Sequence, residues 1–189
     1  MAITIGEYPG RPYRIPAAQM SEEQSALVES ILSGPRKDLP VNMEIWLHSP
    51  AFAAVANRFA EYVGHLAPMT RRVKELTILV TATYWDSKFE WHWHSALARK
   101  LGFDEQQLRA IAEKKPVTLN DPVEQVVYDF SSATLNQRAI DDKLHGRAVR
   151  LLGHAGIADL VGLIGLYSMV AFSLAFYRVP LPSDSSQPG

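Results

Sequence analysis

The residues best suited to chemistry lie in one short stretch of the chain, where Glu90 precedes His94 by four positions. Side chains four positions apart share a face of an α-helix, so a helix here brings a carboxylate and an imidazole within one turn of each other. The rest of this face is largely apolar and consists of Ser87, Trp91, Leu97, Ala98 and Leu101. Because burying either polar group without a partner is costly, the spacing predicts a Glu90–His94 pair.

Glu75 and His92 are the other candidates for this chemistry. His92 lies two positions before His94, and side chains two apart do not share a helix face, so it is the weaker of the two histidines. Glu75 lies on the preceding predicted helix, where a surface contact with Arg71 or Arg72 is its plainest role. If the two helices pack antiparallel, Glu75 reaches toward the predicted pair and becomes a third member of the site.

Each candidate also has a purely structural interpretation. His94 can be a core histidine that Glu90 satisfies, and Glu75 can belong to a polar network between helices, because buried ion pairs occur without catalysis. A metal site needs three or four converging ligands, and only Glu90 and His94 are spaced to chelate together, so we expect no metal ion. The remaining histidines are expected on the surface or in loops: His48, His65, His145 and His154.

The candidates fall on two consecutive predicted helices. Thr70 is suited to cap the first, which runs to about residue 86 with apolar residues at helical spacing. The second begins at about Ser87 and ends at Gly102, because glycine readily takes the left-handed conformation that closes a helix.

Caps and apolar periodicity predict further helices on both sides of these two. Capping boxes begin at Ser21 and Asp104, and a proline in the first helical position follows Ser49 and Asp121. The predicted helices cover about residues 21–33, 51–65, 104–113, 121–135, 141–152 and 160–177, with a short apolar segment over residues 41–47 and a break at Gly153. No two-residue alternation is long enough for a strand, so the sequence predicts an all-α fold.

These elements divide the chain into three predicted segments. Residues 1–20 form an extended arm, because three prolines in this stretch forbid regular hydrogen bonding. Residues 21–180 form a single helical domain, and residues 181–189 form a disordered tail. With 189 residues, 47% of them hydrophobic, the chain can bury a sizeable core without a covalent staple.

Composition removes several classes of function. The formal net charge is -1 without long runs of like charge, so nucleic acid is not an expected partner. The absence of cysteine excludes disulfides, thiol nucleophiles and Cys-ligated clusters.

Residues 160–177 are uncharged and reach the length of a membrane span, but Asp159 and Arg178 bracket them closely. We expect a core or interface helix of a cytoplasmic protein with no membrane contact, since the N-terminus lacks a signal peptide.

The window from Arg71 to Phe103 resembles one protein superfamily. It contains R-x-x-E-L-x-I-L, then E-W, then a His four residues after that Glu, then A-x-x-x-G-F. This pattern is similar to that of the carboxymuconolactone decarboxylase family and of its redox relatives, the alkyl hydroperoxidase D-type proteins. The resemblance is strongest over residues 49–111 and follows the helical trend through residue 177. It implies an all-α, alkyl hydroperoxidase D-like helical bundle.

The redox relatives carry a Glu, then C-x-x-C, then a His four residues after the second Cys. By this resemblance Glu75 takes the Glu position, Ser87 and Glu90 take the two Cys positions, and His94 takes the His position. Since serine cannot replace a redox thiol, the resemblance implies the cysteine-free decarboxylase branch.

This branch implies a cofactor-free carboxy-lyase of aromatic-compound catabolism that acts on a small carboxylated lactone or ring acid. His94 is expected to donate a proton to carbon, Glu90 to orient the imidazole, and Glu75 to supply a second acid or position the pair. The expected substrate-binding residues are Arg71 and Arg72 for a carboxylate, Trp91 for a flat ring, and Ser87 and Trp85.

Two other functions stay open at this stage. A catalytically silent helical oligomer that binds a small aromatic or lactone ligand fits the same residues, while the lack of cysteine disfavours a peroxide-linked antioxidant role. A homo-oligomer (a dimer, trimer or hexamer) is expected, because the family assembles and the helix over residues 160–177 is too apolar to face water. Trp93 is expected in core packing or at a subunit interface.

Overall fold

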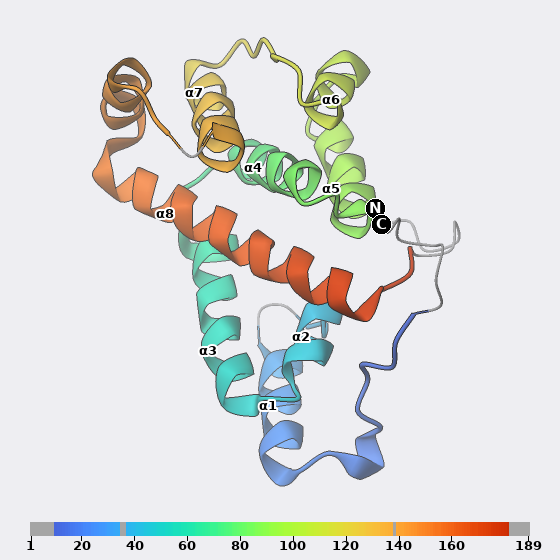
Figure 1. Cartoon of the computed structure of the whole chain (residues 1–189). Coiled ribbons are helices and arrows are strands. Elements are labelled where there is room, and N and C mark those ends of the chain that lie inside the picture. Colours follow the sequence, from blue (N-terminus) through green and yellow to red (C-terminus); the bar gives the residue numbers. More distant parts are fainter. Residues whose placement is uncertain (1–9, 35–36, 138, 182–189) are drawn as a thin grey trace.

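The structure, a computed structural model, describes residues 10–34, 37–137 and 139–181 (Figure 1). Of the described residues 74% are helical, and no strand occurs among them, which confirms the predicted all-α class. The α-helices are α1 (Glu22–Ser33), α2 (Val41–Trp46), α3 (Pro50–Glu61), α4 (Arg71–Tyr84), α5 (Lys88–Lys100), α6 (Glu105–Ala112), α7 (Pro122–Ser132) and α8 (Asp142–Tyr177). A 3-10 turn covers Ala17–Gln19, and π-helical turns cover Tyr62–Leu66 and Ala133–Gln137.

The two helices that carry the candidates begin and end where the sequence predicts. The Thr70 hydroxyl accepts a hydrogen bond from the Val73 amide at the start of α4. Helix α5 closes just before Gly102, whose φ of +87° places it in the left-handed region. The Ser21 and Asp104 capping boxes are also formed. The helix predicted over residues 51–65 differs, because its last turn widens into the π-helical turn Tyr62–Leu66.

Gly153 interrupts the longest helix without ending it. The segment Asp142–Tyr177 is one helical element, yet Gly153 has φ 67° and ψ 171° inside it. This conformation is open to glycine because it lacks a Cβ atom, and it bends the chain between a short first part and a long second part of α8. The predicted break is therefore present, as a kink between two helical segments.

Helix α4 lies at the centre of the bundle and is buried along most of its length. Figure 1 shows α8 crossing the molecule, with α4 to α7 on one side and α1 to α3 on the other. Leu76 and Leu79 of α4 are fully buried in a first core with α5, α6 and α7, whereas Ile78 joins a second core with α2, α3 and α8. Every residue from Val73 to Ala82 is buried, so the polar side chains among them need partners inside the protein.

The apolar helix α8 contributes to both cores. Among the described residues it is the one helix long and apolar enough to cross a membrane by length and composition, and 39% of its most apolar stretch is buried inside the protein. Within the predicted apolar helix over residues 160–177, a stripe of four residues is buried in the second core: Leu163, Leu166, Val170 and Leu174. Because the chain itself covers this stripe, the stripe gives no support to a subunit interface, and the homo-oligomer stays a prediction. Val161, Phe172 and Phe176 remain exposed.

The described part of the arm lies against the end of α8 and against α2. The Arg11 amide donates to the Tyr177 carbonyl at 2.9 Å, and the His48 ring contacts the Tyr13 carbonyl at 2.8 Å. The Arg14 guanidinium pairs with Glu44 of α2. The arm is extended from Gly10 to Pro16 and then forms the 3-10 turn. The predictions for residues 1–9 and, apart from Leu181, for the tail lie outside the described residues.

Candidate active site

The three predicted catalytic residues meet where α4 packs against α5. His94 Nδ1 lies 2.6 Å from Glu75 Oε2, and His94 Nε2 lies 3.6 Å from Glu90 Oε2. Glu75 is 1% exposed and also accepts an ion pair from Arg71, whose Nε lies 2.8 Å from Oε1. Two helices thus assemble the chain Arg71–Glu75–His94–Glu90, in which the buried Glu75 carboxylate is held from both sides.

The geometry exchanges the expected roles of the two carboxylates. Glu75, not Glu90, is within hydrogen-bond distance of the imidazole, so Glu75 is the residue that orients it. An ionised carboxylate accepts but cannot donate, and therefore Nδ1 carries the hydrogen of this bond. Glu90, one helical turn before His94, lies near Nε2 but beyond hydrogen-bond distance. The His94 imidazole is therefore closer to Glu75 on the neighbouring helix α4 than to Glu90 on its own helix α5.

These residues form one wall of a cavity of about 530 Å³. Helix α4 contributes Arg71, Lys74, Glu75 and Ile78, and α5 contributes Phe89, Glu90, Trp93, His94 and Leu97. Helix α8 closes the cavity with Leu163, Leu166, Tyr167, Val170 and Leu174, and the segment at residues 38–42 lines it as well. The cavity is largely apolar, with its ionisable groups concentrated on α4 and α5, which is the usual character of a small-molecule site.

Three aromatic residues of this cavity, Phe89, Trp93 and Tyr167, were not assigned to it from sequence. Trp93, expected in core packing or at an interface, lines the cavity beside His94. Tyr167 of α8 places its ring edge-on against the His94 imidazole, with ring centroids 5.2 Å apart. His65, expected on the surface, is exposed and also lines the cavity. Spacing along α5 favoured Trp93 no more than Trp91, and the contact from α8 has no local pattern in the sequence.

Three expected substrate-binding residues lie away from this cavity. Ser87 and Trp91 line a separate hollow of about 330 Å³, and Trp91 also packs against the first core. Trp85 donates from its indole nitrogen to the Ser168 hydroxyl at 2.9 Å. The reason is the rotation of α5, because the side of the helix with Ser87 and Trp91 faces α4 and the first core. The expectation that these three residues contact the same substrate as His94 is therefore wrong for this cavity.

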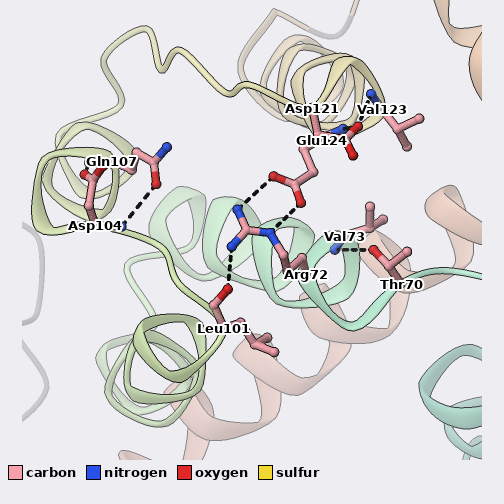
Figure 2. A network of polar contacts seen from close by, with 9 residues as sticks. All are labelled: Thr70, Arg72, Val73, Leu101, Asp104, Gln107, Asp121, Val123 and Glu124. Atoms are coloured by element: carbon pink, nitrogen blue, oxygen red, sulfur yellow. Dashed lines mark hydrogen bonds and ion pairs between the residues drawn. The ribbon is translucent and has the colours of Figure 1, made fainter.

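Arg72 is likewise engaged elsewhere, as Figure 2 shows. Its guanidinium binds Glu124 of α7 through two nitrogens, at 2.5 and 2.9 Å, and donates to the Leu101 carbonyl. The Phe103 ring lies 4.1 Å from the guanidinium carbon. The bond to Glu124 raises the pKa of Arg72. Arg72 ties α4, α5 and α7 together, so of the two arginines only Arg71 remains for a substrate.

Lys74 is a further charged residue of the cavity that the sequence analysis did not select. It is 8% exposed, and its ammonium donates to the Gly64 carbonyl at 2.9 Å, within the π-helical turn after α3. Burial lowers the pKa of Lys74, and the nearby positive charge of Arg71 lowers it further. Within the described part of the chain, Lys74 forms no ion pair with a carboxylate.

Other features of the described residues hold none of the predicted catalytic side chains. A cavity of about 640 Å³ between α4, α7 and the start of α8 is lined by polar and basic residues, among them Lys114, Tyr128 and Arg147. No group of three or more His, Asp or Glu side chains in residues 10–34, 37–137 and 139–181 is arranged to hold a metal ion. His92 does not line the His94 cavity.

Comparison with known proteins places the fold. No family model matches the chain, and no curated protein matches its sequence. Among solved structures, the chain is similar to an uncharacterised peroxidase-related protein from Silicibacter sp. TM1040, with a TM-score of 0.69 and 12% identity over 95% of this chain and 97% of that one. It is also similar to a variant of the debrominase Bmp8 in complex with 2,3,4-tribromopyrrole, with a TM-score of 0.66 and 11% identity over 90% and 91%.

A third structural relative is a protein of unknown function from Agrobacterium tumefaciens, described as a candidate antioxidant defence protein AhpD. Its TM-score is 0.62 at 16% identity, over 74% of this chain and 96% of that chain. The chain therefore has the alkyl hydroperoxidase D-like fold, as the sequence pattern implied. At these identities the likeness establishes the fold alone, and the reaction must be argued from the site.

Proposed function

We propose that the protein is an acid–base enzyme, a carboxy-lyase resembling carboxymuconolactone decarboxylase that acts on a small carboxylated lactone or ring acid. The observation that carries this proposal is the 2.6 Å contact between Glu75 and His94 at the wall of an apolar cavity. The contact fixes the imidazole through Nδ1 and leaves Nε2 for proton exchange. The chain has no cysteine, so a thiol-based reaction on this fold is not open to it.

Decarboxylation of a ring acid needs two things from the protein. As the carbon–carbon bond to carbon dioxide breaks, its electron pair passes through the conjugated double bond into the lactone carbonyl, and the resulting dienolate must then be protonated on carbon. Nε2 of His94 supplies that proton, and Glu75 stabilises the cation before transfer. A proton from water then restores the imidazole ring, and Glu90, 3.6 Å from Nε2, is placed to accept that proton and pass it on.

The shape and lining of the cavity support a small flat substrate. The Trp93 and Phe89 rings and the apolar residues of α8 offer surfaces for a ring, and about 530 Å³ admits a small molecule. One structural relative, the debrominase, is in complex with the ring compound 2,3,4-tribromopyrrole. A ring ligand is thus compatible with the fold.

Substitution of His94 tests the proposal. With a lactone or ring acid that the wild-type protein consumes, followed by loss of ultraviolet absorbance, His94→Ala should lower turnover by about 100-fold or more. His92→Ala is the matched control, since His92 lies on the same helix but not at the cavity, and it should leave turnover nearly unchanged. Circular dichroism should be the same for all three proteins.

The opposite pattern contradicts the proposal. If His92 is essential and His94 is dispensable, the site has been placed on the wrong face of α5. If the wild-type protein consumes no substrate of this class and His94→Ala still binds such ligands, the chain is a binding protein and not a lyase.

A further inference from the structure

Lys74 carries a buried charge that has no carboxylate within ion-pair distance among the described residues; the more distant Asp159 carboxylate raises its pKa, but less than burial lowers it. Transfer of an ammonium group out of water is expensive unless a counter-charge accompanies it. Lys74 is 8% exposed, yet its hydrogen-bond partner is a neutral carbonyl, that of Gly64. The direction of its pKa, lowered by burial and by Arg71, expresses the same cost. Such a charge is stabilised once an anion enters the cavity beside it.

The other ionisable groups on this wall are already committed to one another. Arg71 pairs with Glu75, and Glu75 also holds His94, which in turn faces Glu90. Asp38, also at the cavity, is exposed and forms no ion pair with Lys74. Among the described residues that line this cavity, Lys74 is therefore a buried cation without a carboxylate partner at ion-pair distance.

The ammonium also has donors to spare. A lysine ammonium carries three N–H groups, and the bond to Gly64 uses one of them. Gly64 lines the same cavity, so the ammonium is fixed at the cavity wall by the π-helical turn. A planar carboxylate accepts hydrogen bonds from such a group at short distance.

We propose that Lys74 binds a carboxylate of the substrate in the His94 cavity and makes the site selective for anionic ring compounds over neutral ones. This inference rests on the proposed function only in taking that cavity as the substrate site. An ion pair stabilises a carboxylate where it is bound, so the carboxylate at Lys74 anchors the substrate, and a second carboxylate on the ring carbon is the one that leaves as carbon dioxide. The apolar end of the ligand then lies against Trp93 and α8, and the reacting carbon faces His94.

Binding of benzoate and benzamide tests this inference without any turnover. The two probes have the same ring and differ in charge, and calorimetric titration measures both dissociation constants. Because a hydrogen bond to a charged group contributes about 1.5–3 kcal/mol, wild-type protein should prefer benzoate by about 10- to 100-fold. Lys74→Met should abolish this preference and leave benzamide affinity nearly unchanged. Lys100→Met, which removes the same charge from an exposed site at the far end of α5, should keep it.

Folding does not confound the result, because Met fills a similar volume and removes an unbalanced buried charge. Lys74→Gln provides a second variant that keeps a hydrogen-bond donor for Gly64 and should also lose the preference. Retention of the preference in both variants, or no preference for benzoate in the wild-type protein, overturns the inference. His94→Ala should keep the preference, so loss of turnover there and loss of charge selectivity at Lys74 are separate outcomes.

Discussion

Two arginines that are neighbours in sequence serve two different regions of the molecule. Arg72 points to α7, where Glu124, the Leu101 carbonyl and the Phe103 ring occupy its guanidinium (Figure 2). Arg71 points to the cavity, where it shares Glu75 with His94. Side chains at consecutive helix positions point in directions about 100° apart, so one turn of α4 places an arginine in each of the two regions.

The two regions differ in how many of their charged and polar groups have partners within the protein. Each of the three guanidinium nitrogens of Arg72 donates to a protein oxygen, and the pKa of Arg72 is raised by its bond to Glu124. At the cavity, the pKa of Lys74 is lowered, and His94 Nε2 lies 3.6 Å from Glu90 Oε2, beyond hydrogen-bond distance. A closed network stabilises the fold, whereas an open one retains groups that can act on a ligand.

The largest expected effect comes from replacing the carboxylate of each network. Glu75→Gln keeps the size of the side chain but removes the charge that stabilises protonated His94, so turnover should fall by about 100-fold. Glu124→Gln makes the same change in the closed network and should lower stability with little effect on turnover. Steady-state kinetics and thermal unfolding of both variants measure the comparison. Equal losses of turnover in Glu75→Gln and Glu124→Gln would mean that the Glu75 network and the Glu124 network do not differ in function.

A smaller effect is expected from the arginines, and it concerns stability. Arg72→Met leaves the Glu124 carboxylate, which is 8% exposed, without its partner. The free energy of unfolding should therefore fall by about 2 kcal/mol. This is less than the loss for a fully buried ion pair, because Arg72 itself is 32% exposed. Arg71 is 55% exposed and Glu75 keeps His94 as a partner, so Arg71→Met should cost about 0.5 kcal/mol or less. Urea unfolding measures both. A larger loss for Arg71→Met would reverse the assignment of the two networks.

The helical fold could be predicted because its determinants are local. The Ser21 and Asp104 capping boxes, the Thr70 cap and the left-handed Gly102 each involve residues within a few positions of one another. Even the kink at Gly153 follows from a single residue type. These features fix where helices begin and end, whatever they pack against.

The composition of the site depended on contacts between distant residues. The spacing placed Trp91 on the face of Glu90 and His94 and Trp93 away from it, but packing against α4 decided that Trp93 lines the cavity and Trp91 does not. Similarly, nothing near Arg72 in the sequence identifies Glu124, which lies 52 positions away. Lys74 was missed for the same reason, since its burial follows from the central place of α4.

The smallest expected effect is a difference in how stability depends on pH. Lys74 has a folded-state pKa below its ordinary value of 10.5, so between these two values the unfolded chain binds a proton that the folded chain has released. The free energy of unfolding contributed by Lys74 therefore rises as the pH increases through that interval. Urea unfolding of wild-type protein and Lys74→Met from about pH 7 to about pH 10.5 should show the wild type gaining stability relative to the variant. The pKa of Arg72 is raised by its bond to Glu124, so Arg72 stays protonated over this range and the difference between wild type and Arg72→Met should stay flat. If the stability difference between wild type and Lys74→Met changes with pH in the same way as that between wild type and Arg72→Met, the proposed contrast between Lys74 and Arg72 is wrong.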